Sequence, residues 1–145
     1  MSERPVRLAR ADFRVFRPIP TRWHDNDVFG HVNNVVYYGW FDTIVNAWLI
    51  EQGLLDLGGS EIVGLVAGTR CSYFESTAFP ETVDGGLAVE TLGRSSVTYR
   101  IGIFRQGGEL AAAQGLFTHV YVERATQKPV PIPEASRAAM SAITV

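Results

Sequence analysis

The feature that most constrains the fold is a proline-free segment, residues 35–53, which is apolar on almost every side when it is read as a helix. Its sequence is VVYYGWFDTIVNAWLIEQG, with Tyr37, Phe41, Ile44 and Trp48 at helical spacing. A helix with so little polar surface has to be covered on most of its circumference. The segment therefore predicts a buried helix over residues 35–49, ending near Gly53, a residue type favoured just after helix C-termini.

One narrow stripe of this helix is different, and it could face a cavity, a partner or water. Its members fall at i, i+3, i+4 and i+7 and are small or polar: Gly39, Asp42, Thr43 and Asn46. We expect the apolar remainder to lie along the concave side of a sheet. Gly39, which has no side chain, is expected to permit a close approach there.

The second half of the chain has the period of two that is typical of strands. In SVTYRIGIF, residues 96–104, Val97, Tyr99 and Ile101 fall on one face and Thr98 on the other. A turn around Gly93 precedes this run and a Gly-Gly turn follows it, which predicts three hairpin-linked antiparallel strands within residues 87–123.

Two earlier strands and a short final helix complete the prediction. The strands are expected over residues 62–74 and 12–17, and Pro18 and Pro20 restrict the latter to an edge or a bend. The helix is expected to begin near Pro133 or Glu134. No linker or repeat interrupts the chain, so residues 1–145 are predicted to form one α+β domain, with a long central helix and about five antiparallel strands.

Charge and cysteine content narrow the class of protein. Lys and Arg number 13 against 15 Asp and Glu, so the basic surplus of a nucleic-acid binder is missing. The lone Cys71 cannot form an internal disulfide, which suits a reducing compartment. The first residues lack the apolar core of a secretory signal, and no segment is apolar enough to cross a membrane. We expect a soluble, cytoplasmic protein without membrane or nucleic-acid partners.

The most polar stretch of the chain, WHDNDVFGHVNN, spans residues 23–34 just before the helix. Counted from Asp25 as position 1, the sequence begins like a calcium-binding loop. Phe29 and Val36 then stand at the fifth and twelfth positions, which need oxygen ligands. His24 and His31 have no thiolate nearby to complete a zinc site. We expect no metal. The chain also lacks G-x-S-x-G, Walker A and G-x-G-x-x-G motifs, which disfavours serine hydrolases, nucleoside triphosphatases and Rossmann enzymes.

Two interpretations of this stretch remain from the residues alone. Asp, Asn and Gly are the residue types of turns, and Asn33 or Asn34 is a natural helix N-cap. Alternatively, Asp27 is a catalytic carboxylate placed just before the positive end of a buried helix. The free amide groups there would stabilise an oxyanion while the carboxylate attacks or activates water.

The segment TRWHDNDVFGHVNNVVYYGWFD closely resembles the signature of hotdog-fold acyl-CoA thioesterases of the 4-hydroxybenzoyl-CoA thioesterase-like group. GRSSVTYRI is similar to the family's penultimate hairpin, and HVYVERATQKPVPIP to its last strand and proline-rich exit. The resemblance implies a long helix wrapped by a curved antiparallel sheet. It also implies that two chains pair sheet edge to sheet edge, and that each active site draws on both.

Position by position, the resemblance makes Asp27 the catalytic carboxylate, as nucleophile or general base. The backbone N–H at or beside Asn34 becomes the oxyanion contact. The residues it implies in substrate binding are His31, Asn33, Tyr37, Asp42 and Arg94. Two of these assignments stay open: Asp42 contacts either the substrate or the chain interface, and Arg94 either contacts a phosphate at the nucleotide end of CoA or is solvated. We expect Asp25 to be structural, and Cys71 and His119 to be packed residues without chemistry.

The implied activity is hydrolysis of an acyl-CoA thioester to free acid and CoA. CoA is then part of the substrate, and neither a separate cofactor nor a metal is expected. The implied assembly is a homodimer or homotetramer. Two rivals stay open: a hotdog-fold dehydratase or hydratase using His31 with Asp42, and a non-catalytic acyl-CoA-binding protein. The identity of the acyl group stays open as well.

Overall fold

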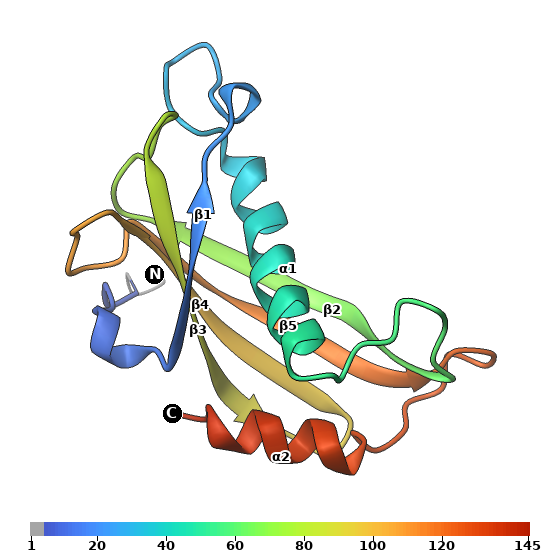
Figure 1. Ribbon diagram of the computed structural model, residues 1–145. Helices are drawn as coiled ribbons and strands as arrows, with labels where there is room; N and C mark the ends of the chain where they lie inside the picture. Colours follow the sequence, from blue (N-terminus) through green and yellow to red (C-terminus); the bar gives the residue numbers. More distant parts are fainter. Residues whose placement is uncertain (1–4) are drawn as a thin grey trace, which may run out of the picture.

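The computed structural model describes residues 5–145, in which a curved antiparallel sheet wraps one long helix (Figure 1). The sheet has five strands in the order β1-β3-β4-β5-β2. The elements are β1 (Val15–Pro20), α1 (Asn34–Glu51), β2 (Ile62–Tyr73), β3 (Thr82–Leu92), β4 (Ser96–Arg105), β5 (Ala113–Glu123) and α2 (Glu134–Ala142), with two short 3-10 turns at Arg10–Asp12 and Trp23–Asp25. The predicted α+β architecture is confirmed.

Helix α1 is the centre of the core, as its sequence predicts. The side chain of Asn33 caps it by accepting a hydrogen bond from the Val35 N–H at 3.1 Å. Gly53 follows the helix with a positive φ of 71°, the conformation that favours glycine after a C-terminus. The buried residues of α1 belong to the hydrophobic core between the helix and the sheet: Tyr37, Trp40, Phe41, Ile44, Val45, Trp48 and Leu49.

The expected close approach at Gly39 is wrong. Gly39 is exposed, and a Cβ placed there would meet nothing within 4 Å. The close approaches lie on the sheet instead. A Cβ at Gly85 would come within 2.5 Å of Ile44, and one at Gly115 within 2.7 Å of Phe41. Large helix side chains thus enter spaces that sheet glycines leave open, whereas Gly39 does not contact the sheet.

Strand boundaries differ from the prediction at three places. β1 runs to Pro20 because it is an edge strand paired only with β3, where a missing N–H is tolerated. β3 begins at Thr82, earlier than expected, and passes through the Gly85-Gly86 pair, which weakens the strand signal. β5 begins at Ala113, because the Ala111 N–H instead donates to the carbonyl of Leu8.

The second edge of the sheet is long and carries exposed apolar side chains. β2 pairs only with β5, and its other side is open. Ile62, Leu65 and Val66 on this strand are 38, 42 and 52% exposed. A long open edge of this kind is a ready template for pairing with another chain.

Helix α2 begins at Glu134 after Pro133, as predicted, and lies beside β3. Within residues 5–145, neither helix has the length and apolar character needed to span a membrane.

Candidate active site

The polar stretch before α1 folds into a tight turn that sets Asp27 beside His31. The Asp27 N–H donates to the His31 carbonyl at 2.9 Å, and the Gly30 N–H donates to the Asp27 carbonyl at 3.1 Å. Gly30 has a φ of 79°, which glycine adopts without strain. One carboxylate oxygen of Asp27 accepts the Phe29 N–H at 2.8 Å. Among the described residues the other oxygen has no hydrogen-bond donor, so it is available to water or substrate.

Asp25 holds this turn in place. It is fully buried, and its carboxylate accepts from the Arg22 backbone N–H at 2.8 Å and from the Arg22 guanidinium at 2.8 and 3.0 Å. Its carbonyl accepts the Asn33 N–H at 2.8 Å. Asp25 therefore ties the turn to the residue that caps α1, which is the structural role expected of it.

The cap leaves one amide free at the start of α1. The Val35 N–H donates to the Asn33 side chain and the Val36 N–H to the Asn33 carbonyl. The Asn34 N–H has no acceptor among the described residues. It lies in the first turn, where unpaired amides and the helix dipole favour negative charge. This amide is therefore available to a developing oxyanion.

A cleft of about 280 Å³ opens at this helix start. Three residues predicted for the site line it, His31, Asn34 and Tyr37. Asp27 and Asn33 are not among the lining residues: the Asp27 backbone N–H bonds the carbonyl of His31, and the side-chain oxygen of Asn33 caps the helix. Tyr37 is buried, and its hydroxyl is 2.6 Å from that of Thr77. Burial raises the pKa of Tyr37, so its phenol is neutral near pH 7.

The opposite wall comes from the end of β2 and the residues after it. The sequence did not reveal these residues: Tyr73, Phe74, Glu75 and Ser76. The Tyr73 hydroxyl donates to the Asn34 carbonyl at 3.1 Å, and its ring packs edge-on against Tyr37 with centroids 5.1 Å apart. Tyr73 thus fixes the helix start from across the cleft. The one signal in the sequence for this wall was the polar run that follows the predicted strand at residues 62–74.

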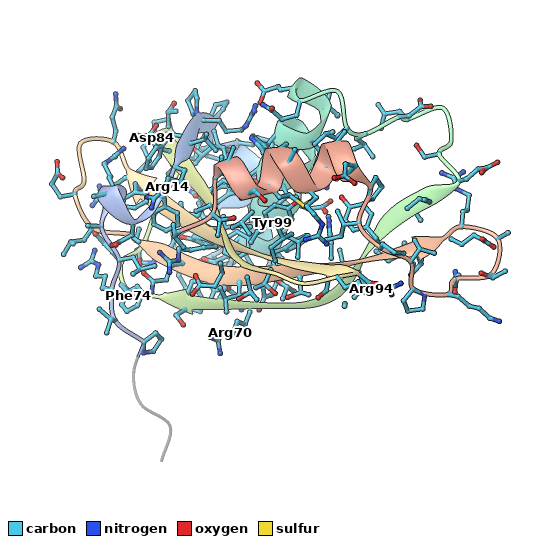
Figure 2. All side chains as sticks on the ribbon, turned by 90° about the horizontal axis from the view of Figure 1, so that it is seen from below. Arg14, Arg70, Phe74, Asp84, Arg94 and Tyr99 are labelled. Carbon is cyan, nitrogen blue, oxygen red and sulfur yellow. The ribbon has the colours of Figure 1, made fainter. Side chains whose placement is uncertain are left out.

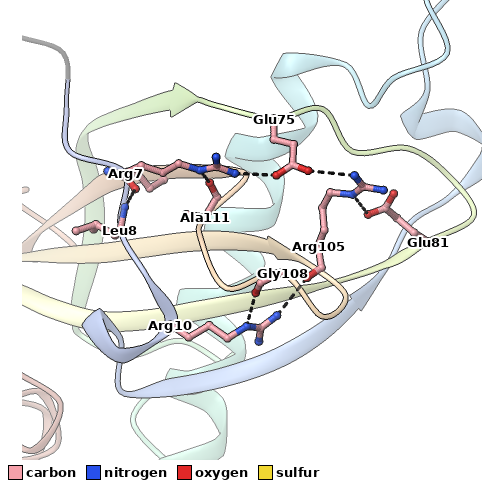
Figure 3. A network of polar contacts seen from close by, with 9 residues as sticks. Arg7, Leu8, Arg10, Glu75, Glu81, Arg105, Gly108 and Ala111 are labelled. Atoms are coloured by element: carbon pink, nitrogen blue, oxygen red, sulfur yellow. Dashed lines mark hydrogen bonds and ion pairs between the residues drawn. The ribbon is translucent and has the colours of Figure 1, made fainter.

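Glu75 is held by two arginines (Figure 3). Arg7 donates to one oxygen at 2.7 Å and Arg105 to the other at 3.1 Å, while Arg105 also bonds Glu81 at 3.2 Å. Hydrogen bonding from Arg105 and Arg7 holds the pKa of Glu75 below its usual value. Glu75 is therefore an ionised wall residue with both oxygens engaged, which suits a structural role better than that of a free acid.

Two residues predicted for substrate binding lie away from the cleft. Asp42 is exposed on α1, about 12 Å along the helix from Asn34, and accepts from the Asn46 amide at 3.0 Å. Arg94 lies in the turn between β3 and β4, at the end of the sheet opposite Phe74 (Figure 2). Within one chain, therefore, neither residue reaches the cleft.

Other reactive groups give no competing centre. Within residues 5–145, no three His, Cys, Asp or Glu side chains are grouped as metal ligands would be. Burial raises the pKa of the Cys71 thiol to about 11, so it is protonated near pH 7.

Comparisons with known proteins identify the family. A model of the thioesterase-like superfamily matches residues 21–140. None of the curated proteins matches the chain. The crystal structure of the PA5185 protein from Pseudomonas aeruginosa strain PAO1 superimposes with a TM-score of 0.92 and 50% identity, covering 96% of this chain and 97% of that one.

Two further structures share the fold. The PA2801 protein of Pseudomonas aeruginosa gives a TM-score of 0.80 at 30% identity, with 86% of this chain and 95% of that chain covered. The DHNA-CoA thioesterase of Staphylococcus aureus gives 0.77 at 24% identity, covering 87% and 90%. The predicted hotdog fold is confirmed by these likenesses. Since the family model covers most of its length, the chain belongs to the thioesterase-like superfamily and is a thioester hydrolase.

Proposed function

We propose that the protein is an acyl-CoA thioesterase, which hydrolyses an acyl-CoA to the free acid and CoA. The observation that carries this proposal is the free Asn34 N–H at the start of α1, in a cleft beside the turn that holds Asp27. The superfamily acts on thioesters, and one protein of the same fold is named for a CoA thioester.

The chemistry needs two groups. A nucleophile must reach the carbonyl carbon, and positive potential must stabilise the carbonyl oxygen as it becomes negative. Asp27 supplies the first, either by attacking to give a mixed anhydride that water then opens, or by deprotonating the attacking water. The Asn34 N–H and the helix dipole supply the second. CoA leaves as a thiolate, and the scheme uses neither a metal nor a separate cofactor.

Release of free CoA, followed with a thiol reagent, separates this proposal from its rivals. The panel should include aromatic, short, medium and long acyl-CoAs. We expect many turnovers with at least one of them. A non-catalytic binder would release no CoA, and a dehydratase or hydratase would change the acyl group while leaving the thioester intact.

We further propose that the functional unit is a homodimer, or a homotetramer built from such dimers, paired through the open edge of β2. The exposed apolar residues Ile62, Leu65 and Val66 support this assignment. A two-fold axis pairs an edge strand with itself in antiparallel orientation, so the Ile62 end of one β2 lies beside the Tyr73 end of the other.

This pairing would bring Arg94 close to the cleft of the partner chain. Ile62 is paired with Glu123, and Ser96 with Val120, so Arg94 lies at the Ile62 end of the sheet. The two-fold arrangement brings that end to the partner's cleft. Arg94 would then serve the site of the other chain, in agreement with a composite active site.

Light scattering should show a dimer or larger species at assay concentration. The Val66→Lys substitution places a charge on the proposed edge and should yield a monomer with strongly reduced turnover. Leu110→Lys is the matched control and should stay assembled and active. Leu110 is also apolar and is 44% exposed, but it lies between β4 and β5, away from the proposed edge. A fully active monomer would contradict the composite site.

Arg94→Ala should raise KM for acyl-CoA several-fold and leave kcat nearly unchanged. A phosphate contact far from the thioester binds the ground and transition states alike, so its loss affects KM. Lys128→Ala, which removes an exposed cation from a nearby turn, is the control. Steady-state kinetics of both variants test this, and an unchanged KM for Arg94→Ala would assign the residue to the solvated surface.

A further inference from the structure

A second cavity, of about 70 Å³, lies between the later half of α1 and the first residues of β2. Apolar residues from the end of α1 and the segment after it form part of its wall, together with Asn46, Gly64, His119 and Tyr121 and the polar or charged residues Asp56, Ser60 and Arg124. Its volume suits one or two water molecules or a small terminal group of a ligand. The thioester chemistry described above does not use it.

His119, in the wall of this cavity, has an unpaired polar atom. The residue is only 3% exposed, and its Nδ1 has no hydrogen-bond partner within residues 5–145. The ring is held edge-on by Phe117 and Tyr99, with centroids 5.1 and 5.9 Å away. Burial lowers the pKa of His119, so the imidazole is neutral near pH 7. A buried polar atom of this kind calls for a partner.

Gly64 keeps the space next to this atom open. A Cβ at Gly64 would lie 3.3 Å from Nδ1 of His119 and 3.4 Å from Cζ of Tyr121. Any side chain there would therefore occupy the position from which a ligand atom could reach the imidazole. Gly64 and His119 both line the cavity, so Nδ1 lies beside the space that the glycine leaves open.

The cavity is remote from the cleft of its own chain, and the proposed pairing would place it close to the cleft of a two-fold partner. Asn46 lies about 18 Å along α1 from Asn34. The cavity lies at the Ile62 end of β2, which the proposed pairing sets beside the partner's cleft. Asp42, bonded to Asn46, lies near enough for its charge to act on His119.

We infer that this cavity receives the distal end of an acyl group bound at the partner's cleft, and that Nδ1 of His119 hydrogen-bonds a hydroxyl on that end. A hydroxyl fits the small volume, and because it both donates and accepts it pairs with either neutral tautomer of histidine. The inference rests on the proposed acyl-CoA thioesterase function and names its substrate class as hydroxylated acyl-CoAs.

Matched substrates test this selectivity. Straight-chain acyl-CoAs of increasing length should be compared with their ω-hydroxy counterparts by kcat/KM. For chains that reach the cavity, the wild type should prefer the hydroxylated substrate by about three- to tenfold, the gain from one hydrogen bond. His119→Leu removes the acceptor and Gly64→Ala fills the space, so both should abolish the preference while the parent substrates are still hydrolysed.

Tyr99→Phe is the matched control. In the described part of the chain its hydroxyl is the other buried polar side-chain atom without a partner, but Tyr99 does not line the cavity. The control should keep the wild-type preference. Hydrolysis of both substrate series with no preference in the wild type, or a preference that survives both His119→Leu and Gly64→Ala, would overturn the inference and leave the thioesterase function standing.

A binding measurement separates failure of the inference from failure of the function. The chain has three histidines, so their ¹⁵N resonances can be resolved, and the exposed His24 serves as an internal reference. Inert ω-hydroxyalkyl-CoA thioethers should shift the His119 resonance, while alkyl-CoA thioethers of equal length should not. Equal shifts would overturn the inference. This binding result does not depend on turnover. A protein that hydrolyses no acyl-CoA would overturn the thioesterase function, and the His119 shifts would still test the cavity.

Discussion

Replacing Asp27 with asparagine should lower kcat for acyl-CoA hydrolysis by about 100-fold or more, with little change in substrate binding. Attack on the carbonyl and deprotonation of water both need an ionised carboxylate, and an amide supplies neither. The neutral side chain keeps nearly the same shape, so the turn and the helix start should persist. Steady-state rates of CoA release give kcat, and binding of an inert CoA thioether gives the affinity.

Asp25→Asn is the control for this substitution, because it makes the same chemical change two residues away. It should lower the free energy of unfolding by about 1–3 kcal/mol, since a buried carboxylate bonded to Arg22 is lost. The folded fraction should still turn over. Near-normal turnover by Asp27→Asn, together with loss of activity in His31→Ala, would instead favour the histidine-based dehydratase or hydratase.

The largest loss of stability is expected from Gly115→Ala on β5. A Cβ at this position would lie 1.9 Å from the Arg70 carbonyl oxygen of β2 and 2.7 Å from the Phe41 ring of α1. The backbone of β2 and the buried helix both have to shift, so the free energy of unfolding should fall by about 3 kcal/mol. Chemical denaturation monitored by tryptophan fluorescence measures this change.

Gly68→Ala is the matched control on the neighbouring strand, where a Cβ would meet nothing within 4 Å. Its effect on the free energy of unfolding should stay within about 0.5 kcal/mol. Equal stability of the two variants would mean that β2, β5 and α1 do not approach one another as closely as described.

The sequence predicted the elements whose patterns are local. Helix α1 followed from its apolar circumference, and β4 from the alternation of Val97, Tyr99 and Ile101. The start of β3 was missed because Gly85 and Gly86 weaken a strand signal. Those glycines are required by side chains from other elements, Ile44 at Gly85 and Phe13 at Gly86, which no local pattern reveals.

The residues of the candidate site also fall into two groups, those brought together locally and those that depend on the tertiary fold. The proximity of Asp27, His31 and the helix start arises from one short turn, so it could be predicted from consecutive residues. Tyr73 reaches the same cleft, and Thr77 reaches the hydroxyl of Tyr37, only because β2 ends there, which depends on strand order. Arg94 was assigned by family resemblance alone, and within one chain it lies at the end of the sheet far from the cleft.

A crystal structure with an inert acyl-CoA analogue tests the central claim most directly. In a suitable ketone analogue, a methylene group separates the carbonyl from the sulfur, so the carbonyl remains but cannot be hydrolysed. The account predicts a carbonyl oxygen about 2.7–3.1 Å from the Asn34 N–H, with the Asp27 carboxylate facing the carbonyl carbon. A carbonyl bound by other donors, with Asp27 turned away from it, would contradict the account.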